Sequence, residues 1–131
     1  MTVTAVNHFT ILTDDLPATL AFYEAHLNLK AGARPPFTFP GAWLYADGGR
    51  GPEPILHIIA GQKKDVLVKG VIDHMAFSGK GLAGAVEKLQ KKNIKYELRQ
   101  QVGSRTWQLF FFDPNDAKIE IDYDPGEAAP A

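Results

Sequence analysis

The sequence predicts an α+β protein built from two βαβββ modules, which together form a curved, mostly antiparallel eight-stranded sheet. Two observations lead to this prediction. β-type and helical patterns follow one another in the same order in both halves of the 131-residue chain, and a histidine opens each half, at His8 and at His74. Because about 60 residues bury too little surface to fold alone, we expect one domain with modules at residues 3–61 and 71–124 and a linker at 62–70.

The first half is expected to run strand, helix and three strands. Asp14 or Asp15 can cap a helix over Leu16–His26, and Pro17 suits its first turn. The segment "ADGGRGPEP" is rich in turn residues and separates the last two strands. The expected strands are Val3–Leu12, Leu29–Arg34, Ala42–Ala46 and Ile55–Ala60.

The second half repeats this order. Leu82, Val86 and Leu89 form an apolar stripe at helical spacing within Leu82–Asn93. The turn "DPND" separates the last two strands. The expected strands are Val71–Ser78, Tyr96–Gln101, Thr106–Phe112 and Ile119–Tyr123.

Composition excludes several functions. Fourteen basic and fifteen acidic residues give a net charge of −1, which offers no general attraction to nucleic acid or to an anionic membrane. No run of 18 apolar residues and no signal peptide is visible. Cysteine is absent, which removes disulfides and thiolate ligands and is compatible with the cytoplasm, where we expect the protein.

The two halves also match at particular residues. A leucine opens the helical pattern eight residues after each histidine, and a tryptophan precedes the last strand of each half. Trp43 stands 14 residues before His57, and Trp107 stands 13 before Glu120. We therefore interpret His57 and Glu120, like His8 and His74, as equivalent positions of a repeat.

Imidazole and carboxylate groups at repeated positions indicate a site for one divalent metal ion. We expect His8, His74 and Glu120 to be its ligands, because two histidines and one carboxylate can occupy one face of an octahedron and leave positions open for substrate. Fe2+ or Mn2+ is expected first, with Zn2+, Ni2+ and Co2+ also suited. For His57, the roles of metal ligand, acid–base group and core histidine all stay open. For Glu120, the simpler alternative to a metal ligand is a residue on a solvated strand face.

The segment "ARPPFTFPGAWLYA" predicts a stiff aromatic loop that forms an apolar wall for a small substrate, with Arg34 among its polar contacts. The alternative is a loop that packs in a dimer interface. The expected pocket residues are Phe37, Phe39, Trp43, Tyr45, Phe111 and Tyr123.

Three segments, "NHFTI…DLPATLAFYEAHLNL", "IDHMAF" and "FFFDPNDAKIEI", resemble the vicinal oxygen chelate superfamily. It includes glyoxalase I, fosfomycin-resistance transferases, extradiol dioxygenases, methylmalonyl-CoA epimerase and bleomycin-binding proteins. The likeness runs from about Val6 to Tyr123 and departs mildly at the last turn, where Asp116 or Ala117 replaces the usual glycine. It implies paired βαβββ modules, a metal held by His8, His74 and Glu120, an oxygen-chelating substrate and a homodimer.

Position 57 bears on the reaction that this resemblance implies. Glyoxalase-like members generally carry a carboxylate there, whereas His57 resembles the acid–base histidine of extradiol dioxygenases. The tyrosine of those dioxygenases is missing, because residues 109–111 are Leu-Phe-Phe. A fosfomycin-type enzyme needs cations, and Arg99 and Arg105 are the candidates in the second half. We expect an extradiol-type dioxygenase, with a glyoxalase-like lyase or epimerase, or a small-molecule binding protein, as alternatives.

Overall fold

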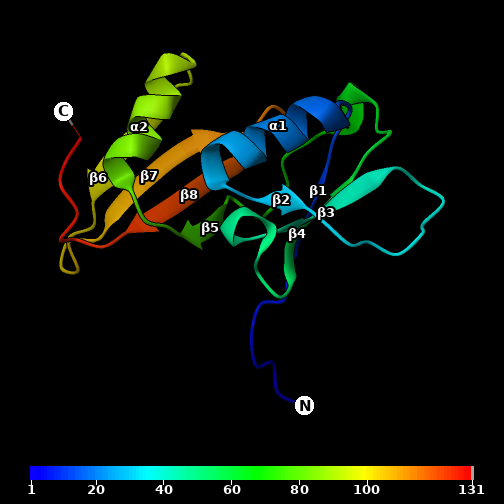
Figure 1. Ribbon diagram of the computed structural model, residues 1–131, viewed down its shortest axis with the longest axis horizontal. Coiled ribbons are helices and arrows are strands. Elements are labelled where there is room, and N and C mark those ends of the chain that lie inside the picture. Colours follow the sequence, from blue (N-terminus) through cyan, green and yellow to red (C-terminus); the bar gives the residue numbers. More distant parts are fainter. Residues whose placement is uncertain (131) are drawn as a thin grey trace. The chain divides into compact units, whose positions relative to one another are not determined.

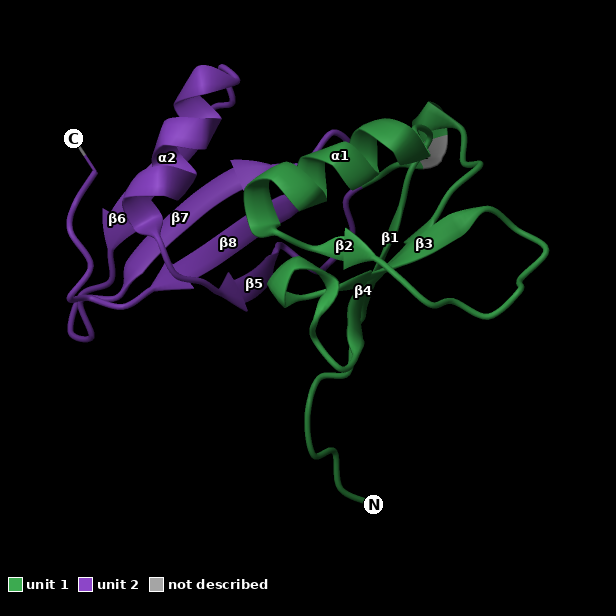
Figure 2. Cartoon of the chain, in the orientation of Figure 1, with its two compact units in different colours: residues 1–68 green, residues 69–131 purple. Residues whose placement is uncertain are grey.

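The chain folds into two compact units of the same topology. The computed structural model describes residues 1–130, and its first unit ends at Val68 (Figure 2). That boundary lies inside the segment 62–70 that we expected to join the modules. No helix in the described part of the chain is long and apolar enough to cross a membrane.

Unit 1 contains one helix and a four-stranded mixed sheet with the strand order β1-β4-β3-β2 (Figure 1). β1 runs parallel to β4, and the other two pairings are antiparallel. The elements are β1 (Phe9–Leu12), α1 (Leu16–Leu27), β2 (Lys30–Ala31), β3 (Gly41–Tyr45) and β4 (Pro54–Ile59), with short 3-10 turns at Asp47–Gly49 and Lys64–Val66.

Local chemistry explains where α1 begins and ends. The Asp15 carboxylate accepts a hydrogen bond from the Ala18 amide at 3.1 Å, and Pro17 lies in the first turn. Asn28 ends the helix in the left-handed conformation, with φ of 53°. Tyr23 of the helix is completely buried, and so are Leu44, Leu56 and Ile58 of the sheet. These side chains form the core of unit 1 and leave the other sheet face for Trp43 and His57.

Unit 2 repeats the arrangement with the strand order β5-β8-β7-β6, again with one parallel pair, β5 and β8. Its elements are β5 (Met75–Ser78), α2 (Leu82–Lys91), β6 (Tyr96–Gln100), β7 (Trp107–Phe112) and β8 (Lys118–Tyr123). The predicted stripe of α2 is confirmed, because Leu82, Val86 and Leu89 are buried. The predicted α+β class with two βαβββ modules is confirmed as well.

The strands form two separate four-stranded sheets, and the first strand of each unit is shorter than expected. β1 and β5 begin at Phe9 and Met75, so His8 and His74 each lie just before a strand rather than inside it. β2 ends at Ala31, three residues before the expected end at Arg34.

Strand register supports the repeat but changes one correspondence. Thr10, two residues after His8, pairs with His57, and Ala76, two residues after His74, pairs with Glu120. His57 and Glu120 therefore occupy equivalent positions in the two units. On the neighbouring strand, Trp43 pairs with His57, whereas Phe110 pairs with Glu120. Trp107 pairs with Tyr123 at the far end of β8. The match between the two tryptophans was therefore wrong, and Phe110 is the counterpart of Trp43.

Candidate metal and substrate site

In unit 1 the structure brings His8 and His57 together. Their rings stack with centroids 3.7 Å apart and planes 15° apart, and the other face of His57 stacks on Trp43 at 4.2 Å. Register explains the contact, because His57 faces Thr10 of β1 on one side and Trp43 of β3 on the other. His57 is thus enclosed between two rings.

The environment of His57 favours its neutral form. Burial lowers its pKa from 6.5, and the charge of His8 lowers it further, while a hydrogen bond with the Pro54 backbone raises it. The Nε2 atom is buried and has no hydrogen-bond partner. A neutral imidazole with a free ring nitrogen can accept a proton or bind a cation.

In unit 2 the structure brings His74 and Glu120 together. His74 Nε2 lies 2.7 Å from Glu120 Oε2, and the Gln108 side chain donates to Glu120 Oε1 at 2.7 Å. Phe110 meets His74 edge-on at 5.9 Å. Glu120 is 5% exposed, so both oxygens of a buried carboxylate have partners here. The solvated-face alternative for Glu120 does not describe this side chain.

Each of the two repeated histidines is oriented by the residue before it. His8 Nδ1 lies 2.7 Å from Asn7 Oδ1, and His74 Nδ1 lies 2.7 Å from Asp73 Oδ2. Metal-binding histidines characteristically use one ring nitrogen for such a contact and the other for the metal. Asn7 and Asp73 were not predicted as site residues; the signal for them is a polar residue immediately before each histidine of the repeat.

Asp122 is a further carboxylate beside Glu120. Alternation along β8 places it on the same face as Glu120, two residues on. Burial, followed by a hydrogen bond with Glu120 and the charge of Glu120, raises the pKa of Asp122 to about 6, while the charge of His74 acts in the opposite direction.

The aromatic loop continues the row of rings from His57. Phe37 and Phe39 stack at 4.9 Å, and Phe37 lies 6.1 Å from Trp43. Three of the expected pocket residues, Phe37, Phe39 and Trp43, therefore form a row of rings in which Trp43 contacts His57. Tyr45 is held differently, because its hydroxyl donates to the Ala33 carbonyl at 2.6 Å.

Two glycines fix the ends of this loop. A Cβ on Gly41 would stand 2.1 Å from the Ile58 carbonyl oxygen, so only glycine allows β3 to approach β4 there. A Cβ on Gly32 would stand 2.9 Å from the Tyr45 ring. The loop thus enters and leaves the sheet through positions that have no room for a side chain.

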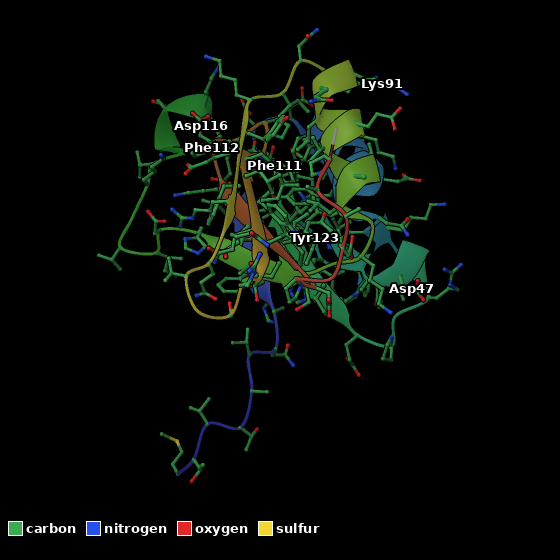
Figure 3. The ribbon with its side chains drawn as sticks, turned by 90° about the vertical axis from the view of Figure 1, so that its left-hand side faces the viewer. Asp47, Lys91, Phe111, Phe112, Asp116 and Tyr123 are labelled. Carbon is green, nitrogen blue, oxygen red and sulfur yellow. The ribbon has the colours of Figure 1, made fainter. Side chains whose placement is uncertain are left out.

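Phe111 and Tyr123 do not lie beside Glu120. They are 1% and 3% exposed, and Figure 3 labels them on their strands. Phe111 pairs with Ile119, and Tyr123 lies an odd number of residues from Glu120, so strand alternation turns both to the opposite face. Burial raises the pKa of Tyr123 to about 12, as expected for a core side chain.

The donors suit a divalent metal, although they occur as two pairs. Within residues 1–130 no group of three or more histidine, aspartate or glutamate side chains is close enough to hold a metal ion. The pairs are His8 with His57 and His74 with Glu120. Fe, Mn, Zn, Ni and Co all accept imidazole nitrogens and carboxylates as ligands. The site offers the oriented rings of His8 and His74, the buried and unpartnered Nε2 of His57, and the buried carboxylate of Glu120.

Paired βαβββ modules with a histidine pair in one and a histidine–glutamate pair in the other define a class of duplicated α+β proteins. The sequence model of the glyoxalase/bleomycin resistance protein/dioxygenase superfamily matches residues 5–121, and the chain belongs to this superfamily. A search of curated proteins gives no significant match.

Solved structures share the fold at low sequence identity. A glyoxylase/bleomycin resistance protein/dioxygenase domain from Frankia sp. EAN1pec has a TM-score of 0.72 and 21% identity, covering 94% of this chain and 99% of that one. The fosfomycin resistance protein FosX from Listeria monocytogenes has a TM-score of 0.69 and 17% identity, covering 93% and 94%. A FosX variant complexed with Mn(II) and 1S,2S-dihydroxypropylphosphonic acid has a TM-score of 0.72 and 16% identity, covering 94% of each chain.

Proposed function

We propose that the protein is a divalent-metal-dependent enzyme that acts on a small substrate with two neighbouring oxygens. The observation that carries the proposal is the repeated orientation of His8 and His74. Each ring has its Nδ1 at 2.7 Å from the residue before it, and His74 lies against the buried Glu120. Fe2+ or Mn2+ is the metal we expect first, and the Mn(II) bound by the FosX variant supports that choice.

Among the reactions of the superfamily, we favour extradiol-type ring cleavage. The bound metal would supply a Lewis acid that draws charge from the two substrate oxygens. His8, His74 and Glu120 would hold it. His57 would accept the proton of a substrate hydroxyl at Nε2, because this nitrogen is unpaired and the lowered pKa keeps the ring neutral. His57 stands where a glyoxalase-like lyase or epimerase would carry a carboxylate, which is why that alternative ranks lower.

A second candidate is a resistance enzyme that acts on a small phosphonate. Two cations on unit 2 favour it: the Arg99 guanidinium lies 4.6 Å and the Lys118 ammonium 5.2 Å from the centroid of the Phe110 ring. Phe110 pairs with Glu120, so both cations lie near the expected ligand. The diol phosphonate bound by the FosX variant is a ligand of this kind. In either case we propose a homodimer located in the cytoplasm.

The test begins with metal binding. We expect one divalent ion per chain in elemental analysis and zinc titration, and no stoichiometric binding in His74→Ala. Asp73→Ala should weaken the affinity for zinc by about 10- to 100-fold, because the ring loses its orienting contact. His26→Ala, a histidine of α1 outside the site, serves as the control and should bind normally.

Activity assays on the metal-loaded protein then distinguish the two candidate reactions. Oxygen consumption by the iron form with catechols supports ring cleavage, whereas conversion of a phosphonate epoxide by the manganese form supports the second candidate. Full retention of metal by His74→Ala would overturn the ligand assignment and with it both candidates.

A further inference from the structure

Arg34 lies at the outer end of the aromatic row. Its guanidinium carbon is 5.0 Å from the ring centroid of Phe37 and 5.1 Å from that of Phe39, and Nη2 donates to the Phe39 carbonyl at 2.9 Å. These contacts fix the group in place. They use one of its five N–H donors, and Nε is buried without a hydrogen-bond partner.

The charge of Arg34 has no counter-ion among the described residues. The ion pairs of unit 1 join Lys30 to Glu24 and Arg50 to Asp47, and none involves Arg34. The Arg34 guanidinium is half-buried, is held by its contacts with Phe37 and Phe39, and has N–H donors that make no hydrogen bond with the other described residues. Such a group is suited to binding an oxyanion, and its planar geometry matches a carboxylate.

The position of Arg34 relates it to His57. Its Nη2 lies 3.1 Å from the place that a Cβ on Gly41 would take. Gly41 is two residues before Trp43 in β3, a span of about 7 Å, and Trp43 stacks on His57. An aromatic ring with one carboxylate covers this distance, so its carboxylate can meet Arg34 while the ring lies along the row toward His57.

We propose that Arg34 selects substrates that carry a carboxylate on an aromatic ring. The inference rests on the proposed function for the placement of the substrate, and it narrows the substrate class from small oxygen chelators to aromatic carboxylates. Phe37 and Phe39, each 42% exposed, provide the apolar surface beside the charge.

The experiment compares two ligands that differ in charge but hardly in shape, 3,4-dihydroxybenzoate and 3,4-dihydroxybenzamide. Their affinities are measured by calorimetry on zinc-loaded and on zinc-free protein. The wild type should prefer the benzoate by roughly 10- to 100-fold, the range for hydrogen bonds to a charged group. Arg34→Gln should bring the two affinities within about twofold and leave the benzamide affinity unchanged, and Arg34→Lys should restore part of the preference.

Arg50→Gln is the matched control, because it removes an exposed arginine of the same unit that is already paired with Asp47, and it should leave both affinities unchanged. Equal binding of the two ligands by the wild type would overturn the inference, and so would an equal loss of both in Arg34→Gln, which would mean that Arg34 only supports the loop. A preference that depends on Arg34 in zinc-free protein, together with absent metal binding, would overturn the proposed function alone.

Discussion

Asp122 and Glu120 place two carboxylates on the same face of β8. Glu120 has His74 and Gln108 as partners, whereas one of the two carboxylate oxygens of Asp122, Oδ1, is buried without a hydrogen-bond partner. When both groups are ionised, burial and the repulsion from Glu120 therefore destabilise the folded state through Asp122. This destabilisation makes the stability of the metal-free protein depend on pH.

We predict that Asp122→Asn stabilises the metal-free protein at neutral pH. The pKa of Asp122 rises from 3.8 to about 6 on folding, so the folded state holds this proton more tightly. The resulting stabilisation is complete below about pH 3.8 and is lost as the pH rises through about 6. The difference in Tm between variant and wild type, measured with chelator, should be more positive at about pH 7.5 than at about pH 4. A difference that does not change with pH would contradict this account of Asp122.

Residue type and repetition predicted the chemistry-bearing residues but not their partners. The histidines and Glu120 stand out because identical or similar polar groups recur at matching places in two apolar strands. Gln108 does not stand out, since an isolated glutamine in a strand carries no such signal. Its role depends on which side chains face each other across the pair of strands β7 and β8.

The helix α2 has no capping residue of its own. Gly81 precedes it with φ of 88° and offers no side chain. The Glu127 carboxylate fills the role from 45 residues away, accepting from the amide of Leu82 at 2.7 Å and from that of Gly81 at 3.1 Å. Trp107 Nε1 donates to the Glu127 carbonyl at 3.2 Å and holds this segment in place.

Glu127→Gln should destabilise unit 2. The change replaces a charged acceptor at a helix N-terminus by a neutral one, and we expect a loss of about 1 kcal/mol in the free energy of unfolding, measured in urea. Glu87→Gln removes an exposed carboxylate of the same helix that pairs with Lys91, and it is the control, with a loss of at most about 0.5 kcal/mol. Equal effects of the two changes would refute the long-range cap.

Element types followed from the sequence, whereas register and face did not. Leu82, Val86 and Leu89 are spaced four and three residues apart, which matches the period of an α-helix and predicted α2. The equivalence of Trp43 with Phe110 was missed because loop lengths differ between the halves, and counting residues from a histidine or glutamate ignores pairing. Phe111 was expected in the pocket, whereas β7 places it on the face opposite Glu120. The sequence could not separate the two faces, because β7 is apolar on both and shows no alternation.

At the scale of the whole molecule, the duplication divides the expected ligands between two units. His8 belongs to unit 1, and His74 and Glu120 belong to unit 2. The pattern of the halves was sufficient to predict the α+β class. It was not sufficient to predict that the strands are hydrogen-bonded as two sheets of four, because the apolar pattern of a strand indicates its buried face and not the strand that pairs with its edge.

The proposed ligand set of His8, His74 and Glu120 predicts that zinc protects both units together. If one ion takes ligands from both, saturation at about 100 times its Kd adds about 2.7 kcal/mol to the free energy of unfolding. Amide hydrogen exchange should slow in β4 of unit 1 as well as in β8 of unit 2. His8→Ala and His74→Ala should each abolish the effect in both units. Protection confined to one unit would show that the ion binds within that unit alone.

The loop that carries Arg34, Phe37 and Phe39 is bounded by Gly32 and Gly41, where a Cβ would meet the Tyr45 ring or the Ile58 carbonyl. For protein engineering, residues 33–40 form a natural cassette. Its length and side chains can be varied in a library to alter substrate choice, while the two flanking glycines stay fixed and keep the sheet, and the His57 that it carries, intact.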